Sequence, residues 1–164
     1  MEKVRVKSLV SHKVVIDDES KRVKRTWDKK NAIRMIPLED LEELIYDPGV
    51  EYMFKEGMLD IDGDNKDEIL VKLGLKEEGE KSPIIILTDE DRRKLMNEMT
   101  SLSAFREKIN ELPREQLNEL VEYCVDNKIM NYEKTAIIKD KTGRDIISMI
   151  RLQEADKEDT SKEE

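Results

Sequence analysis

The chain has 164 residues, of which 42% are charged and 37% hydrophobic, and its formal net charge is −9. No apolar run approaches the roughly 20 residues that a membrane-spanning helix needs, and the single cysteine excludes an intramolecular disulfide framework and a multi-cysteine zinc site. The charged N-terminus does not fit a secretory signal, so we expect a soluble protein of a reducing cytoplasm, without a membrane partner.

Charge is distributed unevenly along the chain. Residues 1–36 carry 11 basic and 5 acidic side chains, whereas the rest of the chain carries 19 basic and 34 acidic ones. The acidic balance argues against a protein that coats nucleic acid, but it leaves room for a local basic contact near the N-terminus.

The N-terminal part is predicted to be rich in β-strands. Val4 and Val6 alternate with charged residues, which is the period of a strand with one buried face. An acidic turn signal at residues 17–20 makes residues 13–17 and 21–27 the predicted arms of a hairpin. A further strand is predicted at residues 33–36.

Two short helices are predicted next. Apolar residues fall on one helical stripe over residues 38–45, and acidic residues lie in the first turns, where the helix dipole favours negative charge. Asp47 and Pro48 then provide an N-cap and a proline at the first helical position of a second helix at residues 50–56. Gly57 can end that helix in a left-handed conformation.

A closing hairpin and a linker complete the predicted N-terminal module. Residues 58–62 and 68–73 resemble strands, and the residues between them tolerate the positive φ angles of a hairpin loop. Residues 76–83 are almost entirely polar, which is typical of a linker.

The C-terminal part is predicted to be helical. Residues 84–87 are apolar and fit either a last strand or a lead-in to a helix. Thr88 and Asp91 resemble a capping box that opens a helix. Apolar residues then recur with helical spacing over residues 102–112.

Further helices are predicted toward the C-terminus. Pro113 begins a strongly amphipathic segment whose apolar stripe includes Cys124. A shorter helical piece covers residues 132–139, and Thr142 with Asp145 resembles a second capping box before another apolar segment.

These patterns predict an α+β protein with two modules. A small β-rich module with two short helices covers residues 1–75, and the linker covers residues 76–83. An all-α helical bundle covers residues 84–153. Residues 154–164 contain six acidic and two basic residues and no large hydrophobic residue, which predicts a disordered acidic tail.

One acidic segment invites comparison with a calcium-binding loop. Asp60, Asp62 and Asp64 occupy the first, third and fifth positions of such a loop. The twelfth position, which should supply a bidentate carboxylate, is Val71, and the required glycine is missing. We therefore interpret the segment as an acidic turn, and no metal is expected.

The remaining reactive residues do not predict an enzyme. His12 is the only histidine, so no histidine pair can bind a metal. Cys124 lies on an apolar stripe, where a cysteine usually packs as a small hydrophobic residue. The six glycines match no phosphate-binding or dinucleotide-binding spacing. We expect no catalytic residue and no cofactor.

The most distinctive segment is basic and contains the only tryptophan. Six cations flank an aromatic ring that is able to stack on a base, which suggests a nucleic-acid or partner contact. The alternative is an edge strand whose lysines face solvent and discourage aggregation. The candidate contact residues are Lys21, Arg22, Lys24, Arg25, Trp27, Lys29 and Lys30.

The order of these features resembles uncharacterised bacteriophage and prophage proteins of Gram-positive bacteria. The resemblance lies in residues 21–36, 38–43, 47–54 and 112–150. It implies a virion-associated or assembly component without enzymatic activity, found in the host cytoplasm or in the virion.

A second resemblance concerns the C-terminal segment. Residues 117–121, a following loop and residues 145–150 look like the helix–extended-loop–helix modules of some phage and nucleic-acid-associated proteins. The loop, with Lys134, Lys139 and Lys141, is only mildly basic.

The leading hypothesis is therefore a non-enzymatic phage-type structural or assembly protein that binds other proteins of a larger assembly. The alternative is a nucleic-acid-binding accessory or regulatory protein that uses the basic segment around Trp27. A third hypothesis, an acidic inhibitor that mimics nucleic acid, rests only on the net charge. The partner and the oligomeric state stay open.

Overall fold

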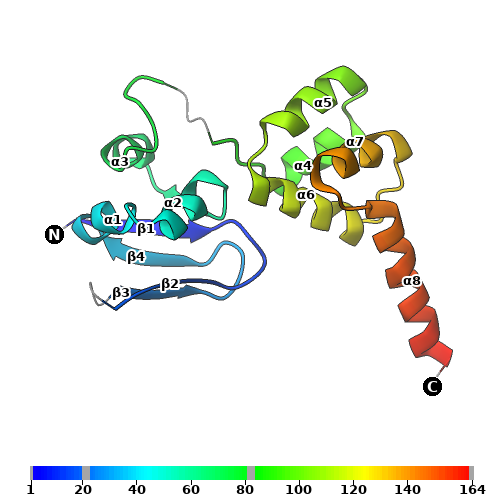
Figure 1. The fold of residues 1–164 in the computed structure, drawn as a ribbon, viewed down its shortest axis with the longest axis horizontal. Helices are drawn as coiled ribbons and strands as arrows, with labels where there is room; N and C mark the ends of the chain where they lie inside the picture. Colours follow the sequence, from blue (N-terminus) through cyan, green and yellow to red (C-terminus); the bar gives the residue numbers. More distant parts are fainter. Residues whose placement is uncertain (1, 20–22, 81–83, 163–164) are drawn as a thin grey trace. The chain divides into compact units, whose positions relative to one another are not determined.

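The protein folds as two compact units. The computed structural model describes residues 2–19, 23–80 and 84–162. The first unit consists of Met1–Ile85 with Pro113–Glu115, and the second consists of Ile86–Leu112 with Gln116–Glu164. The predicted α+β class is confirmed, because the described residues form strands and short helices first and then a series of helices (Figure 1).

The first unit contains two antiparallel sheets. Strand β1 (Lys3–Ser8) lies between β4 (Ile33–Pro37) and β5 (Leu59–Asp62), and β2 (Val14–Asp18) pairs with β3 (Val23–Trp27). All of these strands were predicted, as was the first hairpin. In β1 and β2 every second residue is buried, because successive side chains of a strand point to opposite faces of the sheet.

Two arginines join the hairpin to β4. Arg25 on β3 donates from Nε to the carbonyl oxygen of Met35 at 2.9 Å, and Arg34 on β4 donates from Nε to the carbonyl oxygen of Thr26 at 2.9 Å. Each guanidinium thus satisfies a backbone acceptor of the opposite strand.

Three helices complete the core of the first unit: α1 (Leu38–Leu44), α2 (Pro48–Lys55) and α3 (Lys66–Lys72). Their apolar residues join those of the strands in one buried cluster, and α1 and α2 lie on the same side of the strands (Figure 1). The predicted cap of α2 is confirmed, because the Asp47 carboxylate accepts a hydrogen bond from the Gly49 N–H at 2.8 Å.

The prediction of a closing hairpin at residues 58–73 is wrong. Strand β5 forms as expected, but its partner is β1, and the second run is the helix α3. Ile69, Leu70 and Leu73 are buried at positions i, i+1 and i+4, a spacing that also fits one helical face. A short apolar run does not distinguish the two structures by its period alone.

The segment between the two units is irregular. Residues 76–80 form neither helix nor strand, and residues 81–83 of the predicted linker lie outside the described residues. The open question at residues 84–87 is answered, because the segment is an irregular lead-in to the next helix. Leu87 is buried, and its N–H donates to the Gln116 side-chain oxygen at 2.9 Å.

The second unit is all-helical in its described residues. It contains α4 (Asp89–Asn97), α5 (Leu102–Glu111), most of α6 (Arg114–Asp126), α7 (Tyr132–Thr142) and α8 (Ile146–Lys162), and α7 packs on α5 and α8. The first capping box is confirmed: Thr88 Oγ1 accepts from the Asp91 N–H at 3.1 Å, and the Asp91 carboxylate accepts from the Thr88 N–H at 3.0 Å. No helix in the described part of the chain is both long and apolar enough to cross a lipid bilayer.

The second predicted capping box is wrong. Thr142 is the last residue of α7, and Gly143 ends that helix with a left-handed φ of 77°. Asp145 alone caps α8 by accepting a hydrogen bond from the Ser148 N–H at 3.1 Å. The resemblance to a helix–extended-loop–helix module also fails at this point, because α7 occupies most of the expected loop.

The predicted disordered tail is not confirmed, because α8 continues to Lys162. The buried residues Ile146, Ile147 and Ile150 fix the start of this helix, and helix elongation from a formed nucleus costs little. Lys128 Nζ also lies 3.6 Å from the Glu154 carboxylate, within the part predicted to be disordered.

One buried lysine ties α7 to the end of α4. The Lys134 side chain is 4% exposed, and its ammonium donates to the carbonyl oxygens of Leu95 at 3.0 Å and Met96 at 2.8 Å. Carbonyls in the last turn of a helix have no partner within the helix, so the ammonium acts as a C-cap from a distant segment. It also lies 5.5 Å from the centroid of the Phe105 ring.

We predict that Lys134→Met lowers the free energy of unfolding by about 1 to 3 kcal/mol, because it leaves two buried carbonyls without a donor while it preserves apolar volume. Urea denaturation followed by circular dichroism measures the effect. Lys157→Met, at an exposed position of α8, is the control and should change the stability by less than about 0.5 kcal/mol. Equal effects of the two substitutions would show that the buried ammonium has no capping role.

Candidate functional site

The basic segment lies on and after β3 and is only partly available to a partner. Lys24 and Lys29 are exposed, whereas Arg25 and Lys30 are half-buried. The Arg25 guanidinium is held by the carbonyl oxygens of Met35 and Lys24. The candidates Lys21 and Arg22 lie outside the described residues.

Trp27 is in the core of the first unit. Its side chain is fully buried, and its Nε1–H donates to the carbonyl oxygen of Val6 on β1 at 2.9 Å. A buried indole with a satisfied N–H cannot stack on a base without leaving the core. The stacking role predicted for Trp27 is therefore a misassignment: the ring stabilises the packing of the hairpin against the sheet.

The acidic segment around β5 has structural partners. Asp60 accepts from Lys66 Nζ at 2.7 Å, and Asp62 accepts from Arg5 Nε at 3.1 Å. These two carboxylates face different cations, so they do not form the wall of a common cation site. Within the described ranges, no group of three or more His, Cys, Asp and Glu side chains is placed to hold a metal ion.

Cys124 is fully buried on α6, as its position on an apolar stripe predicted. Burial raises the pKa of its thiol to about 12. The thiolate is therefore scarce near neutral pH, and the side chain acts as a small hydrophobic residue of the core.

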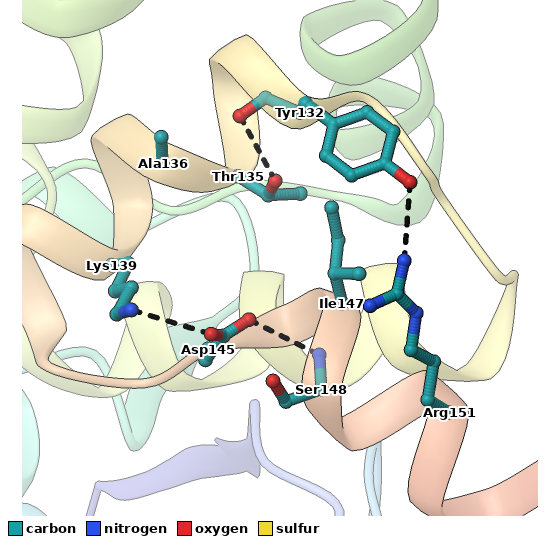
Figure 2. Close-up of a pocket in the computed structure, with 8 residues that line it drawn as sticks. All are labelled: Tyr132, Thr135, Ala136, Lys139, Asp145, Ile147, Ser148 and Arg151. Atoms are coloured by element: carbon teal, nitrogen blue, oxygen red, sulfur yellow. Dashed lines mark hydrogen bonds and ion pairs between the residues drawn. The ribbon is translucent and has the colours of Figure 1, made fainter.

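A groove between α7 and the start of α8 is the strongest candidate site. This α7–α8 groove has a volume of about 290 Å³. Figure 2 shows that its residues come from one stripe of α7 and from the first turns of α8. The lining residues are Tyr132, Thr135, Ala136, Lys139, Asp145, Ile147, Ser148 and Arg151.

Two polar contacts join the helices across the groove (Figure 2). Arg151 Nη2 donates to the Tyr132 hydroxyl at 3.3 Å, and Lys139 Nζ donates to the Asp145 carboxylate at 3.3 Å. The nearly buried side chain of Ile147 lies between them, and the exposed Ala136 lies on α7. The groove therefore combines an apolar centre with a charged and aromatic rim.

The charge state of the acidic rim residue is fixed by its surroundings. The hydrogen bond from the Ser148 N–H and the nearby Lys139 ammonium hold the pKa of Asp145 below its ordinary value. A general acid or base works best when its pKa lies near the operating pH. Asp145 is thus suited to capping α8 and orienting Lys139, and poorly suited to proton transfer at neutral pH.

The Tyr132 ring is the large apolar group of the groove that is most accessible. The residue is 61% exposed, and its hydroxyl is oriented by Arg151. Tyrosine and arginine are enriched among the residues that contribute most to the affinity of protein interfaces. The groove can therefore accept an apolar side chain of a partner beside an aromatic ring and two cations, Lys139 and Arg151.

Sequence reasoning did not identify this groove. The spacing of Tyr132, Thr135, Ala136 and Lys139 on one helical stripe was a signal, but these residues include two polar ones and a small one. Arg151, 19 positions after Tyr132, joins the site only because α8 folds back on α7.

Comparisons of the chain with family models, with curated proteins and with solved structures found no significant match.

The burial of Trp27 predicts its fluorescence. We expect emission that is blue-shifted relative to free tryptophan, weak quenching by iodide and no change on addition of DNA or RNA at low salt. The chain unfolded in urea is the control and should show red-shifted, easily quenched emission. Red-shifted emission from the folded chain would contradict the buried position of the indole.

The burial of Cys124 predicts slow thiol chemistry. We expect the folded chain at pH 8 to react with a disulfide reagent at least about a hundredfold more slowly than the urea-unfolded chain, because the thiol is both buried and protonated. The absorbance of the released thiolate measures the rate. A rapid reaction of the folded chain would mean that Cys124 reaches the surface.

Proposed function

We propose that this protein is a non-enzymatic structural or assembly protein that binds other proteins of a larger assembly, and that the α7–α8 groove is one of its docking surfaces. The proposal includes a phage origin, which rests on the resemblance described above, and a location in the host cytoplasm or in the virion. No cofactor is required for this function.

The observation that carries the proposal is the exposed Tyr132 ring beside Arg151 at a groove that contains the apolar side chain of Ile147. Protein interfaces concentrate their affinity in a few aromatic and arginine residues around a desolvated centre. Ile147 supplies the apolar part of such a centre, and Lys139 and Asp145 form a polar rim that can remain in contact with water.

The size of the groove also favours a macromolecular partner. A volume of about 290 Å³ lies at the lower end of the roughly 300 to 1,000 Å³ that is typical of small-molecule pockets. An interface can use such a groove for one anchoring side chain and gain the rest of its area from the surrounding surface.

The proposal is tested with the products of neighbouring genes, expressed singly and titrated against the purified chain by calorimetry. We expect at least one of them to bind. Ala136→Arg, which fills the groove, and Tyr132→Ala, which removes the exposed ring, should each weaken binding at least about tenfold, because hot-spot truncations cost roughly 2 kcal/mol or more.

Lys141→Ala is the matched control, because Lys141 is exposed on α7 and does not line the groove. It should leave the affinity within about twofold. Binding that is equally insensitive to all three substitutions would contradict the role of the groove. Turnover of a small molecule by the purified chain would contradict the non-enzymatic assignment, and salt-sensitive binding of DNA or RNA that depends on Lys24 and Lys29 would favour the nucleic-acid alternative.

A further inference from the structure

A second hollow lies in the first unit, where α1 and α3 end. Its volume is about 550 Å³. Ile45 and Leu73, both nearly buried, form its apolar part, and Gly74 lies beside them. We call it the α1–α3 hollow, and its lining residues are Glu39, Glu42, Glu43, Ile45, Tyr46, Lys72, Leu73 and Gly74.

The aromatic ring of Tyr46 lies at this hollow and is almost fully exposed to solvent. Tyr46 is 86% exposed, which makes it the most exposed large hydrophobic residue among the described residues. It lies two residues after the end of α1, in a turn in which its N–H donates to the carbonyl oxygen of Glu43 at 3.2 Å. The ring and the acidic residues Glu39, Glu42 and Glu43 line the same hollow. The Tyr46 ring therefore offers apolar surface to a partner and is free to adjust its orientation on binding.

The charges of the hollow select the partner. Glu39, Glu42 and Glu43 are exposed, and in the described part of the chain no ion pair involves any of them. Lys72, the one cation in the lining, lies 3.6 Å from the Glu68 carboxylate on its own helix. The last turn of α1 contains no basic residue. The hollow therefore carries negative charge that its own surroundings do not compensate.

Some surface carboxylates of this unit have a cation close by. Glu51 lies 2.7 Å from Lys55, and Asp62 lies 3.1 Å from Arg5. The acidic stripe of α1 differs from these, and it differs at the place where the surface is hollowed and an aromatic ring is exposed. Three adjacent carboxylates repel one another, and an incoming cation relieves that repulsion.

We propose that the α1–α3 hollow binds an arginine-bearing segment of a partner protein. A guanidinium group can form two parallel hydrogen bonds with a carboxylate and can stack on a tyrosine ring at the same time, which an ammonium group cannot do. The aliphatic part of the arginine side chain fits the apolar surface of Ile45 and Leu73.

The α1–α3 hollow belongs to the first unit and the α7–α8 groove to the second. The two binding proposals are therefore independent, and failure of one does not affect the other. The two surfaces would let one chain hold two partners of different chemistry.

The test uses the full chain and a fluorescein-labelled glycine/serine peptide that carries four arginines. Matched peptides carry four lysines or four glutamates. Fluorescence anisotropy gives the dissociation constants, and two-dimensional NMR of the ¹⁵N-labelled chain locates the contact. We expect the arginine peptide to bind more tightly than the lysine peptide, the glutamate peptide not to bind, and the largest shifts to fall on the amides of residues 42–46 and 72–74.

Variants separate the hollow from the net charge of the protein. The triple variant Glu39→Gln, Glu42→Gln, Glu43→Gln should raise the dissociation constant at least about tenfold, because three charge contacts are lost. The triple variant Glu77→Gln, Glu78→Gln, Glu80→Gln removes the same charge from an exposed irregular segment and should change it by less than about twofold. Tyr46→Ala, at a position too exposed to affect folding, should weaken binding about two- to fivefold.

Three results would overturn the proposal. Absence of binding by the arginine peptide would do so, as would equal weakening by the two triple variants, which would mean attraction to net charge alone. Equal affinity for the arginine and lysine peptides would show that the hollow does not recognise the guanidinium group specifically. Far-UV circular dichroism of each variant, expected to match that of the unchanged chain, guards against a loss that comes from unfolding.

Discussion

Two small apolar cores have to hold together a chain in which 42% of the residues are charged. Burial of apolar surface contributes most of the favourable free energy of folding, so a chain with so few hydrophobic residues must use nearly all of them inside. Most of its large aliphatic side chains are in fact buried. Several polar side chains, among them Lys134, are buried together with these apolar residues.

Several cations form hydrogen bonds with backbone carbonyls. Lys134 caps α4 from α7, and the guanidinium groups of Arg25 and Arg34 join β3 and β4 where no continuous ladder of backbone hydrogen bonds exists. Each of these cations has a long aliphatic stem, so it adds apolar contact as well as hydrogen bonds. Part of the basic charge near the N-terminus thus has a structural role.

The charged side chains at the surface give the two units binding surfaces of different chemistry. The first unit has a hollow with three uncompensated glutamates and an exposed tyrosine, and the second has a groove in which an exposed tyrosine lies beside an arginine. The basic strand, in contrast, has its tryptophan in the core and Arg25 bonded to the backbone. This distribution favours protein partners over nucleic acid as the main ligands of the proposed function.

Local sequence determined most of the secondary structure. The alternation around Val4 and Val6, the cap at Asp47 and the capping box of Thr88 and Asp91 each depend on residues within a few positions of one another, so they could be read directly. Residues 68–73 could not, because their apolar spacing fits a strand and a helix equally well.

Only the tertiary structure decided which segments meet and which side chains are left at the surface. Trp27 packs in the apolar core of the first unit, and its indole N–H is satisfied there by the carbonyl oxygen of Val6, 21 positions away on β1. The α7–α8 groove requires α8 to fold back on α7. The α1–α3 hollow requires the ends of α1 and α3, which α2 and β5 separate in the sequence, to come together. Contacts between distant segments depend on the packing of the whole core, so no local pattern in the sequence encodes them.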